Sequence, residues 1–192
     1  MVAPSAHPKR RADAERNIAR VVSAARTLLS SDPNATTDDI AQAAGVGRMT
    51  LYGHFRTRAD LVEAALKEAL RAGEETLASV DLTGDASAAM SRLLASSWQL
   101  TAESAALLAA AGDVLPPGRV RELHDEPARR VDQLIRRGQE QGVFRTDLPT
   151  AWLVSAVHYI LDGAAKEVRA GRLDARDAAD AVTKSVQSVL TG

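Results

Sequence analysis

Residues 36–55 read TTDDIAQAAGVGRMTLYGHF, and this stretch decides the fold. Thr36 and Thr37, followed by two carboxylates, are typical of a helix start, where hydroxyl and acidic side chains satisfy free backbone amides and offset the helix dipole. Gly45-Val46-Gly47 ends that helix, because glycine takes the left-handed backbone conformation without steric cost. A second short helix is predicted over residues 48–55. Two short helices joined by a glycine-containing turn have the spacing of a helix-turn-helix motif.

The residue types inside the motif favour a DNA-binding unit over a generic helical hairpin. Val46 lies within the turn, and an apolar residue there is expected to point into a small core with Ile40 and Leu51. The second helix carries no carboxylate and little bulk on its outer face, as a helix that lies in a major groove requires. The residues on that face are Arg48, Met49, Thr50 and Gly53.

An amphipathic helix is predicted on the amino-terminal side of the motif. It runs from about residue 12 to the turn signal Asp32-Pro33-Asn34. Its apolar side chains recur at steps of three and four residues, which places them on one helix face. They are Ile18, Val21, Val22, Ala25, Leu28 and Leu29.

Helices are also predicted for the rest of the chain, with breaks at glycine- and proline-containing turns. A long helix begins near Asp60 and breaks at Gly73. Pro127 starts or kinks one of the later helices, because it cannot donate a backbone hydrogen bond. The later helices are predicted over residues 76–81, 86–111, 119–141, 150–170 and 174–190.

Charge is distributed unevenly along the chain, although the formal net charge is only −1 at pH 7. Residues 1–60 hold 9 Lys and Arg and 6 Asp and Glu, a net charge of +3. Residues 61–192 hold the other 15 Lys and Arg and 19 Asp and Glu, a net charge of −4. The excess is too small to indicate nucleic-acid binding by itself. It does predict a basic amino-terminal part and an acidic remainder.

Composition excludes several classes of protein. The 192 residues contain no cysteine, which rules out disulfides, thiolate zinc sites and cysteine nucleophiles and fits a reducing cytosol. We find no targeting segment and no uncharged stretch long enough to span a membrane, so a soluble, cytoplasmic protein is expected. No metal-ligand, phosphate-loop or nucleophile motif is present, and we expect no enzyme activity, no cofactor and no metal.

The motif and its flanks resemble the DNA-binding domain of tetracycline-repressor-type (TetR family) transcriptional regulators over about residues 12–66. The resemblance rests on five separated points. They are Ile40-Ala41, Ala44-Gly45-Val46, Leu51-Tyr52, Phe55, and the basic residue Arg58 ahead of Leu61. It implies an all-α protein of about nine helices, with an amino-terminal three-helix DNA-binding domain and a carboxyl-terminal helical domain for ligand binding and dimerisation.

The resemblance implies roles for individual residues at a DNA surface. Thr37 is placed to donate its hydroxyl and nearby backbone amides to a phosphate. Tyr52, His54 and Arg58 stand where the family contacts the DNA backbone. Arg48 is the candidate for direct base readout, because two of its donors match O6 and N7 of guanine. Weaker contacts to bases or thymine methyl groups are expected from Gly47, Met49, Thr50 and Gly53.

Each assignment has a structural alternative. Tyr52 can be a core residue of the three-helix unit, and His54 can cap the second motif helix. Arg48 can be a solvated surface arginine, as most arginines are. Gly53 departs from the family pattern, since many relatives carry a larger residue there, so this helix either approaches the groove floor closely or reads fewer bases.

Three parts are expected along the chain. Residues 1–11 form a flexible basic arm, residues 12–60 bind DNA, and residues 61–192 form the ligand-binding and dimerisation domain. Within the arm, Lys9-Arg10-Arg11 either contacts DNA or serves as a solubilising tail. The last two helices carry apolar faces that can form a four-helix bundle between two subunits. The alternative is that both faces pack inside one subunit.

An effector cavity is expected between the helices of residues 86–165. The lining candidates are Met90, Leu94, Trp98, Leu107, Leu108, Trp152 and Tyr159, with His124, His158 and Asp162 as polar anchors. The alternative readings are that Met90 and Trp98 belong to an ordinary core and that His158 is a satisfied interface histidine. The predicted function is a ligand-responsive repressor that binds palindromic operator DNA as a homodimer. The competing functions are an all-helical protein-interaction module and a helical enzyme.

Overall fold

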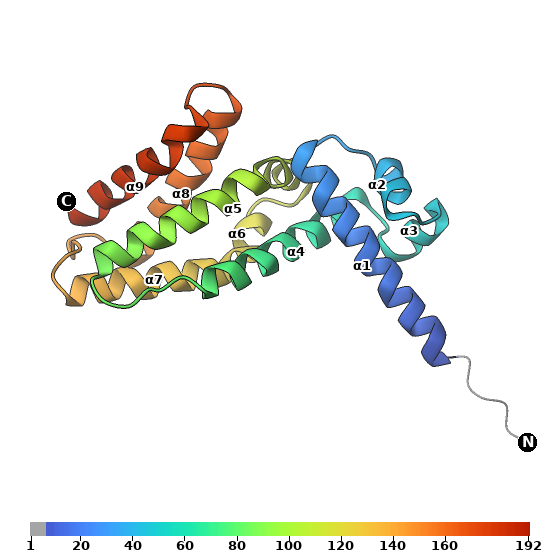
Figure 1. Cartoon of the computed structure of the whole chain (residues 1–192), viewed down its shortest axis with the longest axis horizontal. Coiled ribbons are helices and arrows are strands. Elements are labelled where there is room, and N and C mark those ends of the chain that lie inside the picture. Colours follow the sequence, from blue (N-terminus) through green and yellow to red (C-terminus); the bar gives the residue numbers. More distant parts are fainter. Residues whose placement is uncertain (1–6) are drawn as a thin grey trace, which may run out of the picture. The chain divides into compact units, whose positions relative to one another are not determined.

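The computed structural model describes residues 7–192, and the side chains of residues 12–124 and 128–192 within them (Figure 1). Over that range the chain folds into nine helices and no strand, which confirms the all-α prediction. The helices form two compact units. Unit 1 comprises the chain through Ala69 together with Ala106–Val120, and unit 2 comprises Leu70–Ala105 together with Arg121–Gly192. The predicted domain limits at residues 12, 60 and 192 stay predictions.

Unit 1 contains the helix-turn-helix. Its elements are α1 (His7–Ser31), α2 (Thr37–Ala44), α3 (Arg48–His54) and the first half of α4 (Arg58–Ala78). The amphipathic stripe of α1 packs inward because its apolar residues share one face. The fully buried members are Val21, Ala25 and Leu29, which join Ile40, Leu51, Leu61, Val62 and Leu66 in the core of this unit.

Helix α1 begins earlier than predicted. It starts at His7 instead of near residue 12, so Lys9, Arg10 and Arg11 belong to a helix and not to an extended arm. The remainder of the predicted arm, residues 1–6, lies outside the described residues. No glycine or proline follows Pro8 in this segment, and the charged residues there are good helix formers, which explains why the helix extends toward the amino terminus.

Unit 1 also includes the end of α5 (Ala86–Val114) and the start of the short helix α6 (Arg119–Leu123). An ion pair ties α6 to α4, because Arg119 Nη2 lies 2.7 Å from Glu63 Oε1. Lys67 Nζ lies 2.6 Å from the same oxygen. The hydrogen bonds from Arg119 and then Lys67 lower the pKa of the Glu63 carboxyl to about 2.

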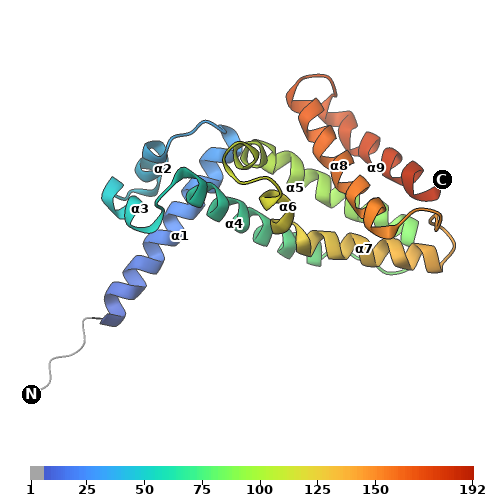
Figure 2. The same ribbon diagram turned by 180° about the vertical axis from the view of Figure 1, so that it is seen from behind.

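Unit 2 is completed by α7 (Asp125–Glu140), α8 (Thr150–Arg169) and α9 (Ala175–Thr191). Helices α8 and α9 are joined by a short turn and lie side by side (Figure 2). Each buries one stripe of apolar residues in the core of unit 2. The stripes are Leu153, Val157, Leu161 and Ala165 on α8, and Ala178, Val182, Val186 and Leu190 on α9.

Two predicted boundaries are wrong. Helix α4 continues through Gly73 to Ala78, so no separate helix forms over residues 76–81. A Cβ at Gly73 would lie at an ordinary van der Waals separation of 3.5 Å from Leu100 Cδ1, and α4 continues through this position despite the low helix propensity of glycine. The predicted helix 119–141 is interrupted at His124, and Pro127 falls in the first turn of α7, where proline is tolerated.

A close approach fixes the connection between α7 and α8. The ring of Phe144, buried in unit 2, lies so near Gly138 that a Cβ on that glycine would meet Phe144 Cδ2 at 2.0 Å. Only glycine fits at this position of α7. Across the part of the chain that the structure describes, none of the helices combines the length and the apolar character needed to cross a membrane.

Candidate nucleic-acid interface

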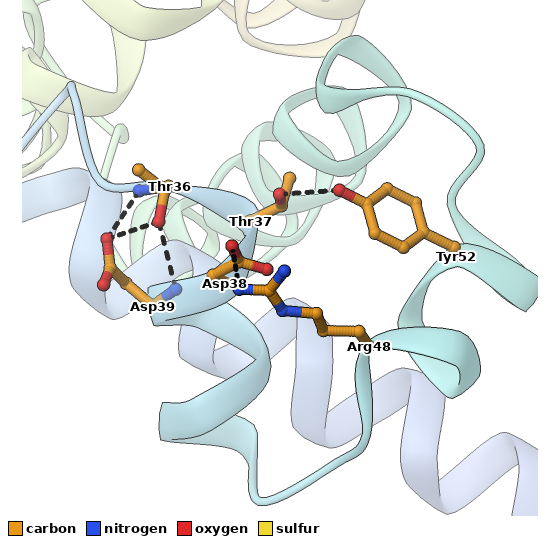
Figure 3. A network of polar contacts seen from close by, with 6 residues as sticks. All are labelled: Thr36, Thr37, Asp38, Asp39, Arg48 and Tyr52. Carbon is orange, nitrogen blue, oxygen red and sulfur yellow. Dashed lines mark hydrogen bonds and ion pairs between the residues drawn. The ribbon is translucent and has the colours of Figure 1, made fainter.

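The start of α2 is fixed by a reciprocal cap. Thr36 Oγ1 accepts a hydrogen bond from the Asp39 amide at 3.2 Å, and Asp39 Oδ2 accepts one from the Thr36 amide at 2.9 Å (Figure 3). The hydroxyl of Thr36 also donates to Asp39 Oδ2 at 2.6 Å. These hydrogen bonds lower the pKa of the Asp39 carboxyl, the side-chain bond from Thr36 most. This is the capping box expected from the hydroxyl and acidic residues of the motif.

The turn after α2 requires glycine and an arginine from α1. Gly45 has φ of 62°, the left-handed conformation expected after the helix, and Val46 in the same turn is half-buried. Arg20 Nη2 donates to the carbonyl oxygen of Ala44 at 2.5 Å and to that of Gly45 at 3.2 Å. Arg20 thereby satisfies carbonyl groups at the end of α2. This role of Arg20 could not be predicted from sequence patterns, because the two ends of the contact lie far apart in the chain.

Helix α3 presents most of its surface to solvent. Leu51 is buried and holds the helix on the core, whereas Met49 is 85% exposed and Tyr52 is 45% exposed. Gly47 and His54 are also exposed, and Thr50 is half-buried. A Cβ built on Gly53 would meet no atom within 4 Å, so the fold does not require glycine there. The exposure of Tyr52 overturns the alternative in which it is a core residue.

Two polar contacts join the first turn of α2 to α3. Thr37 Oγ1 lies 3.1 Å from the Tyr52 hydroxyl oxygen, and Arg48 Nη2 lies 2.5 Å from Asp38 Oδ2 (Figure 3). Thr37 and Tyr52 were predicted to contact phosphates, and the structure brings their hydroxyl groups together. The partner of Arg48 was not predicted, since Asp38 was read only as a helix-start residue.

Arg58, at the start of α4, bonds to the loop between α1 and α2. Its Nη2 donates to the carbonyl oxygen of Pro33 at 2.7 Å, and its Nη1 donates to that of Ala35. The planar guanidinium satisfies two carbonyl groups at once, which a lysine at this place could not do in the same geometry. Arg58 therefore has a structural role beside the phosphate contact that the resemblance implies.

The predicted effector residues fall into separate sets. Met90, Leu94 and Trp98 are buried in the core of unit 2. For Met90 and Trp98 this agrees with the alternative that they are ordinary core residues. Leu107 is buried and Leu108 half-buried in unit 1. Trp152 and Tyr159 are 55% and 59% exposed, because α8 turns its opposite stripe to the core.

The expectation that Trp152, Tyr159 and Asp162 line an interior cavity is corrected, since all three side chains are more than half exposed. Asp162 Oδ2 pairs with Lys166 Nζ at 2.7 Å on the surface of α8. These positions belong to the outer surface of the helix.

His158 and His124 lie in unit 2. His158 Nδ1 lies 2.8 Å from the Val154 carbonyl oxygen, so this nitrogen carries the proton. Burial lowers the pKa of His158, the hydrogen bond to Val154 opposes that shift, and the charges of His124 and Arg121 add to it. His158 is thus a satisfied histidine of the helix α8, in line with the alternative to a ligand anchor.

Comparison with known proteins identifies the overall fold and the family that the DNA-binding segment resembles. Residues 21–65, which include α2, α3 and their flanks, match the family described as bacterial regulatory proteins, tetR family. The match thus covers the helix-turn-helix and its flanks. The resemblance identified from the motif is therefore confirmed for this segment.

Individual relatives agree with this assignment. The HTH-type transcriptional repressor LfrR of Mycolicibacterium smegmatis is 33% identical over 87 residues, which cover 45% of this chain and 46% of LfrR. The sequence match thus spans about half the length of that relative. The crystal structure of the TetR-like regulator LfrR from Mycobacterium smegmatis in complex with proflavine aligns with 93% of this chain and 98% of its own, at a TM-score of 0.69 and 22% identity.

A second solved structure extends the comparison. The TetR family transcriptional regulator PfmR from Thermus thermophilus aligns with 88% of this chain and 97% of its own, at a TM-score of 0.63 and 25% identity. Both units of the chain are therefore covered by the folds of solved regulators.

Proposed function

We propose that this protein is a tetR-type, sequence-specific DNA-binding transcriptional regulator that represses transcription from a palindromic operator. The observation that carries the proposal is the outer face of α3, where Arg48, Met49 and Tyr52 are exposed beside the capped start of α2. An exposed helix of this kind, backed by a small core, fits the major groove of B-DNA. The repressor described for the relative LfrR supports the sign of regulation.

The proposed DNA contacts divide by chemistry. Thr37, Tyr52, His54 and Arg58 supply hydroxyl, imidazole and guanidinium donors to phosphates, which position the protein without reading sequence. Arg48 reads guanine, and Gly47, Met49, Thr50 and Gly53 make the remaining close contacts in the groove. The basic residues of α1 add positive charge on the same unit.

We propose a homodimer formed through α8 and α9. The apolar residues of α8 separate into two stripes, and only one is buried within the subunit. The other stripe includes Trp152 and Tyr159, whose exposed rings favour burial against a partner. A two-fold dimer matches a palindromic operator, since one helix-turn-helix supplies few base contacts.

We propose further that a small molecule relieves repression. The relative LfrR was crystallised with proflavine, which supports a small-molecule effector for this chain. We place this molecule in unit 2, beside the apolar residues Met90, Leu94 and Trp98, with His124 as the polar contact. Ligand binding relieves repression if the liganded dimer favours a spacing of the two α3 helices that no longer fits the operator.

Selection from random DNA tests the proposal. The full-length protein is incubated with a pool of random-sequence duplexes long enough for two half-sites, and bound duplexes are amplified, sequenced and footprinted. We expect an inverted repeat whose half-sites are about one helical turn apart or a multiple of it. Recovery of no preferred sequence, with binding that is insensitive to salt, contradicts the proposal and favours the protein-interaction alternative.

A further inference from the structure

The predicted base-reading arginine is held by a carboxylate of the preceding helix. Arg48 Nη2 of α3 lies 2.5 Å from Asp38 Oδ2 of α2, and the two side chains are 70% and 43% exposed (Figure 3). The pair stands next to the contact between Thr37 and Tyr52, which also joins the first turn of α2 to α3. A negative charge therefore lies within the surface proposed to face DNA.

Asp38 lies outside the reciprocal cap of α2. The capping box is formed by Thr36 and Asp39, which exchange hydrogen bonds between side chain and backbone. Asp38 takes no part in that box, and its carboxylate reaches across to α3 instead. Of these two adjacent carboxylates, Asp39 caps α2, whereas Asp38 forms an ion pair with Arg48.

The chemistry of this pair bears on which DNA groups Arg48 can approach. A guanidinium has five N–H donors, so Arg48 can keep one bond to Asp38 and still offer two parallel donors to O6 and N7 of guanine. A phosphate at the same place would lie close to the Asp38 carboxylate, and two negative charges repel each other. The carboxylate also restricts a long flexible side chain, which lowers the entropy that Arg48 loses on binding.

We infer that Asp38 is a specificity-determining residue of the DNA-binding surface and that it acts through Arg48. The inference rests on the proposed function, because it concerns how the proposed reading residue selects a base. Asp38 directs Arg48 to guanine and penalises its use as a general phosphate contact. Its net effect is to weaken binding to unrelated DNA and to sharpen the preference at one base position of each half-site.

The Asp38→Asn variant removes the charge while keeping the size of the side chain. We expect it to bind random-sequence duplexes more tightly than the wild type does, since a repulsive charge is lost. We expect the preference for guanine at the Arg48 position to fall by about tenfold, within the range for one bidentate base contact. Preferences at the other positions should stay unchanged.

A double-mutant cycle separates this role from general electrostatics. Random-duplex selections are run at one salt concentration with the wild type, Asp38→Asn, Arg48→Ala and the double variant. In the Arg48→Ala background, Asp38→Asn should no longer alter base preference at any position. Asp13→Asn is the matched control, because Asp13 is an exposed carboxylate of α1 paired with Arg16, and its loss should leave every base preference intact.

The outcomes are distinguishable. A wild-type protein that enriches no sequence contradicts the proposed function and the role of Asp38 with it. A wild type that enriches an operator, together with an Asp38→Asn variant of unchanged preference at every position, overturns the role of Asp38 alone. A change of preference that persists without Arg48 also overturns it. Urea unfolding of each variant shows whether the fold is kept.

Discussion

At the residue scale, the side chains of the helix-turn-helix divide into those that build it and those left exposed. Arg20 and Arg58 donate to loop and helix-end carbonyl groups and hold the elements together. Met49 and Tyr52 project from α3 with large exposed areas. The contacts of Arg20 and Arg58 preserve the fold. Substitution of the exposed residues Met49 and Tyr52 should instead alter DNA binding with little effect on stability.

Gly53 gives a test of the exposed face of α3. A Cβ there meets no atom within 4 Å, so Gly53→Ala should fit and raise stability by up to about 1 kcal/mol through higher helix propensity. If α3 lies close to the groove floor, the added methyl group should weaken operator binding by about 1 kcal/mol or more. Urea unfolding and fluorescence anisotropy measure the two effects.

Gly112→Ala is the control for Gly53→Ala. Gly112 also lies in a helix with open space around its Cβ position, and it is outside the helix-turn-helix. This variant should gain stability and bind operator DNA as the wild type does. Equal DNA affinities for both variants would show that Gly53 does not face the groove.

Glu63 gives a pH-dependent test of unit 1. Its pKa is lowered from 4.5 to about 2, so its interactions with Arg119 and Lys67 stabilise the folded state above pH 4.5 and are lost as the pH falls toward 2. Glu63→Gln should lower stability at neutral pH by about 1 kcal/mol and reduce the loss of stability between those pH values. Urea unfolding at a series of pH values checks this, and parallel pH profiles for variant and wild type would contradict it.

At the scale of elements, sequence signals predicted α2 and α3 closely because their boundaries are set locally. The caps Thr36 and Gly45 act on residues within four positions of themselves. Gly73 gave a wrong boundary because the effect of a glycine inside a helix depends on its packing. Pro127 does lie at the start of a helix, as predicted, but the break at His124 was not predicted. The contacts of Arg20, Arg58 and Asp38 could not be predicted, since each joins separate elements through side-chain geometry.

The packing of helix α8 also could not be predicted in full from the sequence, and it leads to a testable prediction. Its wide apolar face was predicted, but only the structure separates the buried stripe from the exposed stripe with Trp152 and Tyr159. Tyr159→Lys places a charge on the exposed stripe and should destabilise a dimer by about 2 kcal/mol or more while leaving the subunit folded. Sedimentation equilibrium measures the dimer dissociation constant.

Gln133→Lys is the matched control for Tyr159→Lys. Gln133 is exposed on α7, so the same charge is added to unit 2 on a different helix. We expect its dimerisation to equal that of the wild type. A Tyr159→Lys protein that dimerises equally well would exclude this stripe from the interface.

At the scale of the whole molecule, a net charge of −1 conceals a basic amino-terminal part and an acidic remainder. DNA binding through the basic part should release counterions, so affinity should fall steeply as salt rises between about 50 and 200 mM. Anisotropy titrations at several salt concentrations measure the slope. A flat salt dependence would indicate that phosphates are not contacted and would favour a protein partner.

The most direct measurement compares wild type and Arg48→Ala on the selected operator and on a scrambled duplex of the same length. We predict that Arg48→Ala loses about 1 to 3 kcal/mol of operator binding per half-site. Binding to the scrambled duplex should change little, and the unfolding midpoint should stay the same, since Arg48 is exposed. Unchanged operator affinity and sequence preference in Arg48→Ala would contradict the placement of α3 in the major groove.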